Sequence, residues 1–172
     1  MSAFPIGCRV AQAIGFTGAA WLAGNISALS TITIPAMIDG HKDDQISTTN
    51  ATSLWKGLYQ RGKSQNPPIA AATASAFLYL AWSVRSGAPL SRVARPNASI
   101  LYGLAALLAV GIVPYTLTAM SSTNNALLAK AGSKSTDDTD TKSLLQKWAS
   151  LNAGRSVLPL AAGLVGIFAA LF

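Results

Sequence analysis

The chain has 172 residues, of which 51% are hydrophobic and only 11% are charged, whereas an ordinary soluble domain has about 25% charged residues. With a mean hydropathy of +0.38, it has too few charges to cover a water-facing surface, which excludes an ordinary soluble domain. The net charge of +7 comes from bases scattered singly between apolar runs. Nucleic-acid-binding domains cluster their bases on one face, so no nucleic-acid partner is expected.

Long uncharged stretches predict membrane-spanning helices, because about 20 apolar residues are needed to cross a bilayer core. We predict four spans, at about 10–38, 66–84, 99–121 and 145–172. In hydrocarbon the backbone must satisfy its own hydrogen bonds, which favours helices. The predicted fold class is therefore all-α, an integral membrane bundle of four transmembrane helices that forms a single domain over residues 1–172.

Prolines and polar segments predict where these helices begin and end. Pro67-Pro68 suits a helix start, since a proline in the first turn loses no needed donor. Pro35 and Pro114 are expected to kink the ends of their helices. The segment 130–142 is rich in Lys, Ser, Thr and Asp, which is typical of a solvated, mobile loop.

The distribution of bases predicts the topology. The loop 85–98 holds three arginines and no acid, and Arg9 precedes the first span without an acid. The loops 39–65 and 122–144 mix Lys and Arg with Asp. The positive-inside rule then places both termini and the loop 85–98 in the cytoplasm, and we expect a protein of the endoplasmic reticulum or a related endomembrane.

Arg155 is the strongest candidate for a functional side chain, because a cation inside a span is costly and usually has a role. On a helix it shares one face with Trp148 and Asn152. This combination of ring, amide and cation would suit a planar ligand that carries oxygen. The alternative is that Arg155 extends to the lipid headgroups without a further role.

Two other stretches carry candidate binding residues. Residues 54–62 (LWKGLYQRG) place Trp55, Tyr59 and Arg61 where they could cover a pocket, although an amphipathic helix at the membrane surface explains the same pattern. In residues 114–125 (PYTLTAMSSTNN), Thr116 and Asn124 fall on one helical face. Such polar groups often only bind neighbouring helices.

His41 is the single histidine and the natural candidate for a general base, although it could equally be a solvated loop residue. One cysteine and one histidine make no zinc site, and no glycine-rich nucleotide loop is present. We expect no cofactor and no metal, although the six aspartates leave an oxygen-ligand metal site open.

Three segments together resemble the anthrone oxygenase family of fungal polyketide pathways, within a larger set of small four-span membrane proteins. They are LWKGLYQRGKSQNPPIAAATA, VPYTLTAMSSTNNALL and LLQKWASLNAGRSVLPLAAGL. The pattern W-x-x-L-N-x-x-R over 148–155 is fairly specific for the larger set. The resemblance covers nearly the whole chain, including the spacing of the spans.

The resemblance implies a monooxygenase that converts an anthrone to an anthraquinone with molecular oxygen and without flavin, haem or metal. By position, Tyr59 and Arg155 would be catalytic together with His41, which matches no distinctive family pattern. The residues implied in substrate binding are Trp148, Asn152, Asn124, Thr116, Trp55 and Arg61. Arg155 would stabilise an oxyanion, and Tyr59 or Asn124 would orient a carbonyl or phenol.

Two alternatives remain open from the sequence. The chain could be a non-catalytic membrane protein that binds a lipid or a polyketide, or that scaffolds the enzymes of a pathway. It could also act on a different substrate on the same scaffold. Membrane lipid is an expected partner in each case, and whether the chain forms a homo-oligomer is undecided by the sequence.

Overall fold

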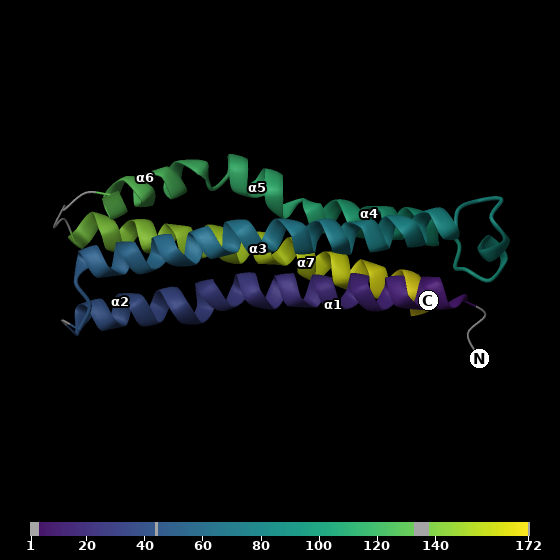
Figure 1. The fold of residues 1–172 in the computed structure, drawn as a ribbon, viewed down its shortest axis with the longest axis horizontal. Coiled ribbons are helices and arrows are strands. Elements are labelled where there is room, and N and C mark those ends of the chain that lie inside the picture. Colours follow the sequence, from purple (N-terminus) through teal and green to yellow (C-terminus); the bar gives the residue numbers. More distant parts are fainter. Residues whose placement is uncertain (1–3, 44, 133–137, 172) are drawn as a thin grey trace. The chain divides into compact units, whose positions relative to one another are not determined.

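The computed structural model describes residues 4–43, 45–132 and 138–171, and within these ranges it contains helices and turns but no strand (Figure 1). The predicted all-α class is confirmed. In chain order the elements are α1 (Ile6–Ala28), the π-helix η1 (Leu29–Thr33), α2 (Ile34–Lys42), α3 (Thr48–Ser83), the 3-10 helix η2 (Pro89–Arg92), α4 (Ala98–Val110), α5 (Ile112–Thr118), α6 (Ser121–Gly132) and α7 (Asp138–Leu171).

Three helical stretches in the described residues are long and apolar enough to cross a membrane. They are Ile6–Lys42, Ala98–Thr118 and Asp140–Leu171, and they overlap the first, third and fourth predicted spans. The length and composition of these helices indicate a membrane protein. The remaining predicted span, 66–84, coincides with the second half of α3, which is not among the three.

The prediction that a helix starts at Pro67-Pro68 was wrong. Both prolines lie inside α3, which already begins at Thr48. They cannot donate to the carbonyls one turn earlier, but α3 continues on both sides of them. A proline rule that considers only the local sequence does not predict this continuity.

Two further irregularities lie close to prolines. The π-turn η1 ends just before Pro35, where the amide of Ile34 donates to Leu29 O, five residues earlier. The predicted span 99–121 is divided into α4 and α5 at Gly111, within one turn of Pro114. A proline lacks the amide that a regular helix needs at its position, so a change of helical pattern nearby is its expected consequence.

Two of the three segments predicted as loops, 39–65 and 122–144, are largely helical in the described residues. Residues 39–42 belong to α2, and α3 takes up 48–65. In the predicted loop 122–144, α6 extends to Gly132 and α7 begins at Asp138. In the predicted mobile segment 130–142, Lys130 Nζ forms an ion pair of 2.9 Å with Asp140, while residues 133–137 lie outside the described residues. Polar composition predicted a solvated segment but missed its helical structure.

The helices divide into two compact units. Unit 1 comprises Met1–Ala23, Pro67–Ile112 and Val157–Phe172. Its core is built from small side chains and three stacked or tilted rings: the ring centroids of Phe16 and Phe77 are 6.1 Å apart, and those of Phe77 and Tyr102 are 6.3 Å apart. A Cβ at Gly166 would lie 2.6 Å from Phe77 Cε1, so only glycine leaves room for this buried ring.

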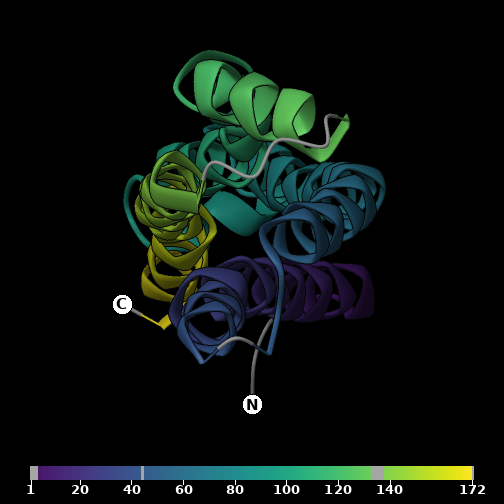
Figure 2. The same cartoon turned by 90° about the vertical axis from the view of Figure 1, so that its left-hand side faces the viewer.

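Unit 2 comprises Gly24–Asn66 and Val113–Ser156. In Figure 2, α2, α6 and the first turns of α3 and α7, which all belong to unit 2, face the viewer. The core of this unit includes Ile34, Trp55, Met120, Leu127 and Trp148. Buried polar side chains join its helices, for example Asn25 Nδ2, which donates to Asn66 Oδ1 at 3.0 Å. All nine candidate functional residues named from the sequence lie in this unit.

Candidate active site

Arg155 lies on α7 and is held by two hydrogen bonds to neutral groups. Its Nη1 donates to Thr116 Oγ1 at 2.8 Å, and its Nη2 donates to Asn152 Oδ1 at 2.7 Å. Its Nε is buried and has no hydrogen-bond partner among the described residues. Neither of the two ion pairs seen in the described part of the chain involves it. The guanidinium N–H groups therefore donate to uncharged acceptors.

Asn152 connects Arg155 to the first helix of the unit. Its side chain is fully buried, and Nδ2 donates both to Ile26 O and to Ser30 Oγ, each at 2.8 Å. The two N–H groups of the amide are thus taken by the protein, and its oxygen accepts from Arg155. A substrate contact to this amide would have to replace one of these bonds.

Three aromatic side chains of the predicted set form one group. The Trp55 and Tyr59 rings are stacked with centroids 5.2 Å apart, and Trp148 meets Trp55 edge-on at 5.9 Å. Trp148 Nε1 donates to Asn124 Oδ1 at 2.9 Å in a buried contact. Trp55 is completely buried and its indole N–H has no partner in the described part of the chain. Tyr59 is the partly exposed member of the group.

The phenol groups of Tyr59 and Tyr115 both lie within electrostatic range of the Arg155 guanidinium. Tyr59 was predicted from the sequence, whereas Tyr115 was missed. A Cβ at Gly154 would lie 3.0 Å from the Tyr115 hydroxyl, so the glycine next to Arg155 lets this phenol approach α7. The adjacency of Tyr115 to Thr116, and of Gly154 to Arg155, is the signal that could have found it.

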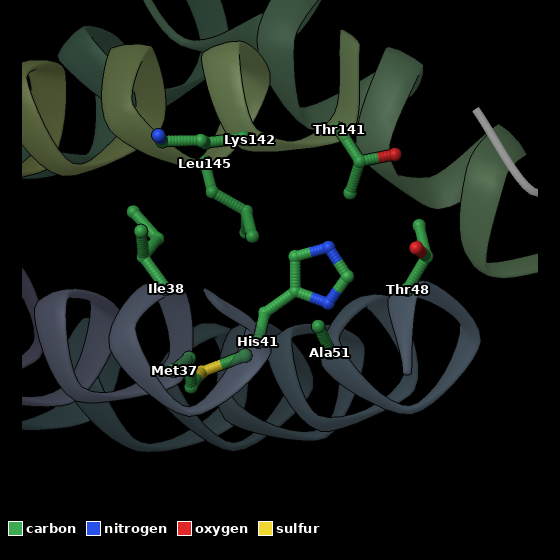
Figure 3. Close-up of a pocket in the computed structure, with 8 residues that line it drawn as sticks. All are labelled: Met37, Ile38, His41, Thr48, Ala51, Thr141, Lys142 and Leu145. Carbon is green, nitrogen blue, oxygen red and sulfur yellow. The ribbon is translucent and has the colours of Figure 1, made fainter. Parts of the chain in front are cut away.

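His41 lies apart from this group. It is in the last turn of α2, where Nδ1 is 2.7 Å from Ile46 O, and its ring faces Thr141 and Leu145 across a small cavity (Figure 3). The cavity volume of about 10 Å³ suffices for roughly one water molecule. Leu145 and Arg155 are ten residues apart on α7, which corresponds to about 15 Å along the helix axis.

Arg61 is also outside the group. It is exposed on α3 and follows Tyr59 by two residues, a spacing that directs two side chains to different faces of a helix. In the described residues, no three His, Cys, Asp or Glu side chains gather in a way that could hold a metal ion. Asp44, Asp137 and the side chain of Asp138 lie outside the described residues.

Comparison with known proteins decides the family. A family model described as anthrone oxygenase matches residues 55–165. The chain belongs to the anthrone oxygenase family. As an anthrone oxygenase family member it is an enzyme of the oxygenase type, and the matched region contains Trp55, Tyr59 and every candidate residue on α5, α6 and α7, but not His41.

Several fungal proteins are similar to this anthrone oxygenase family member over most of their length. Anthrone oxygenase encC of Aspergillus fumigatus is 34% identical over 92% of the chain and 91% of its own length. An anthrone oxygenase of Claviceps purpurea is 30% identical over 94% of the chain and 87% of its own length. Monooxygenase hypC of Dothistroma septosporum is 26% identical, over 86% and 75%. No solved structure matches the chain.

Proposed function

We propose that the protein oxygenates an anthrone-like aromatic polyketide to the anthraquinone with molecular oxygen, without a cofactor, and that Arg155 stabilises the anion that reacts. The names of the relatives support the substrate class. The observation that carries the proposal is the Arg155 guanidinium, which is partly buried, bonded to Thr116 and Asn152, and free of any acidic partner among the described residues.

The chemistry needs little from the protein. An anthrone loses a proton from its central methylene carbon and becomes an anion whose charge lies largely on the carbonyl oxygen. A fixed cation stabilises this oxyanion most where water is excluded. The electron-rich carbon then binds molecular oxygen, and the resulting hydroperoxide loses water to leave a second carbonyl. One anthrone and one O₂ therefore give one anthraquinone and one water, which balances without an external reductant.

The aromatic group would provide the surface for the flat substrate. Tyr59, partly exposed and stacked on Trp55, would contact the ring system. The Trp55 N–H, which has no partner among the described residues, would donate to a substrate oxygen. Trp148 and Asn124, which are hydrogen-bonded to each other, would line the binding site behind the Trp55 and Tyr59 rings. Thr116 would lie beside the Arg155 cation. Arg61 is left out of the proposed site because it is exposed on another face of α3.

Two side chains compete for the role of base. Tyr59 lies within electrostatic range of the Arg155 cation, so its oxygen would be close to an anthrone bound there. His41 carries the more usual base, an imidazole, but it lies on α2. It lines a cavity with Leu145, which is ten residues before Arg155 on α7. Ten residues correspond to about 15 Å along the helix axis, so one ring system would not contact both groups. We therefore propose Tyr59 as the base, with His41 as the tested alternative.

The proposed membrane arrangement keeps four spans, with residues 66–84 as the second. Residues 64–84 carry no charge, and this half of α3 exposes Leu78 at 55% and Trp82 at 61%, which a lipid environment would accommodate. The loop 85–98 and both termini are proposed to face the cytoplasm. We also propose that the protein lies in an endomembrane and forms one integral membrane domain.

The proposal is tested with the full chain purified in detergent, with metals chelated and ¹⁸O₂ supplied. We expect consumption of one O₂ per anthrone, one labelled oxygen in the new carbonyl, and no bound flavin, haem or metal that tracks activity. A binding or scaffold protein would bind the anthrone without accelerating oxygen uptake. Activity that disappears with a removed metal would contradict the cofactor-free reaction.

A further inference from the structure

Asn152 is the side chain through which Arg155 is tied to the helix that runs from α1 into η1. We infer that Asn152 is a positioning residue, which holds the guanidinium toward the substrate oxyanion, and that Ser30 in the π-turn sets the orientation of its amide. This inference rests on the proposed function. It differs from the substrate-binding role that the sequence suggested for Asn152.

The hydrogen bonds fix which way the amide faces. Asn152 Nδ2 donates to two acceptors of one helix, Ile26 O and Ser30 Oγ, so its oxygen is directed at Arg155 Nη2, 2.7 Å away. The reversed amide would set an N–H₂ group against a guanidinium, which has donors only. Because the side chain is fully buried, no water is available to relieve that conflict.

The π-turn supplies the second acceptor. Ser30 lies within Leu29–Thr33, and single π-turns inside α-helices occur frequently at functional sites. The hydroxyls of Ser27, Thr31 and Thr33 donate to carbonyls of their own helix. The Ser30 hydroxyl instead accepts from Asn152 of α7. The hydroxyl that serves Asn152 is thus the one buried within this turn.

A purely structural asparagine would fill the same space, so the test must report on the cation. Ser30→Ala removes one acceptor and leaves Ile26 O, which should let the amide and the guanidinium shift. Asn152→Asp keeps the size of the side chain and places a carboxylate on Arg155, which neutralises the cation. It also removes the N–H that donates to Ile26 O, so thermal unfolding must show that this variant is folded. Thr31→Ala is the matched control, because Thr31 is an exposed hydroxyl of the same turn that bonds only within its helix.

Two readouts follow from this design. Oxygen uptake with an anthrone gives kcat and KM. The second readout is a pH titration of a bound hydroxyanthraquinone dye, followed by its absorption spectrum. The dye's phenolate absorbs at longer wavelength than its phenol, and a correctly positioned Arg155 guanidinium would stabilise the phenolate. Thermal unfolding in detergent accompanies both, so that a variant that fails to fold is recognised before its activity is interpreted.

We expect Ser30→Ala to lower kcat about 5- to 10-fold, the effect of one net hydrogen bond, with little change in KM and reduced ionisation of the bound dye. Asn152→Asp should lose about 100-fold or more and abolish the dye's ionisation while remaining folded. Thr31→Ala should match the wild type in both readouts.

Equal kcat and dye ionisation in Ser30→Ala and wild type, or an active Asn152→Asp, would overturn the positioning role and leave the proposed function standing. If instead wild type and Arg155→Ala ionise the dye alike, the proposed function fails. A wild type that neither oxidises the anthrone nor binds the dye would contradict both.

Discussion

The contact between Trp148 and Asn124 allows a quantitative test of how the aromatic group is held. Trp148 Nε1 donates to Asn124 Oδ1 at 2.9 Å, and both side chains are at most 3% exposed. Trp148→Phe removes the donor and part of the ring, and it leaves the Asn124 oxygen without this donor. Asn124→Leu removes the acceptor, and the double variant removes both members of the pair.

The size of the effect can be worked out from these contacts. Replacing the indole by a smaller ring leaves a void and loses part of the edge-on contact with Trp55, which costs about 1–3 kcal/mol. Interhelical hydrogen bonds in membrane proteins contribute about 0.6 kcal/mol on average and at most about 1.7 kcal/mol. We therefore expect each single variant to be destabilised by roughly 2–4 kcal/mol, with a coupling energy of about 1 kcal/mol between them.

The assay is reversible unfolding of the purified protein in mixed micelles, measured for wild type, both single variants and the double variant. The double variant should be more stable than the sum of the single effects predicts, because the second change removes a group that the first left unpaired. Strictly additive free energies of unfolding would refute the reasoning, since they would mean that the buried bond does not couple the two helices.

Four further outcomes are expected. His41→Gln should keep turnover within about threefold, whereas Tyr59→Phe should lose about 100-fold, the usual contribution of a general base; the reverse order in a steady-state oxygen assay would assign the proton to His41. Gly166→Ala should destabilise unit 1 by about 1–3 kcal/mol, because the new Cβ would lie 2.6 Å from Phe77 Cε1, and thermal unfolding measures this. The matched change Gly103→Ala, with nothing within 4 Å of its Cβ, should be neutral or stabilising by up to about 1 kcal/mol. Single cysteines in the loop 85–98 should react with an impermeant thiol reagent only after the cytoplasmic face is opened, and labelling from the other face would reverse the topology.

Helical periodicity predicted the local part of the site. Asn152 and Arg155 are three residues apart on α7 and hydrogen-bond directly, as residues on one helical face can. Thr116 lies 39 residues from Arg155, and no spacing rule reaches that far. Thr116 was named because it shares a helical face with Asn124, and the family resemblance added a role in substrate binding, but neither predicted its contact with Arg155.

Other features had no marker in the sequence. The acceptors of Asn152 are a backbone carbonyl at Ile26 and a hydroxyl in a π-turn, and neither can be told from its neighbours by residue type. His41 was singled out for its chemistry alone, and no sequence pattern relates its position to that of Arg155. For α3, the proline rule considers only the local sequence, whereas the helix continues through Pro67 and Pro68.

Oxygen uptake by Arg155 variants tests the central claim most directly. Arg155→Ala should lose about 3 kcal/mol of transition-state stabilisation, or about 100-fold in turnover, and Arg155→Lys should recover little because an ammonium lacks the planar fork. Lys147→Ala, which removes a charge from an exposed position on the same helix, should keep wild-type turnover. The same turnover in Arg155→Ala as in wild type, with an anthrone as substrate, would contradict the assignment of Arg155 to the reaction.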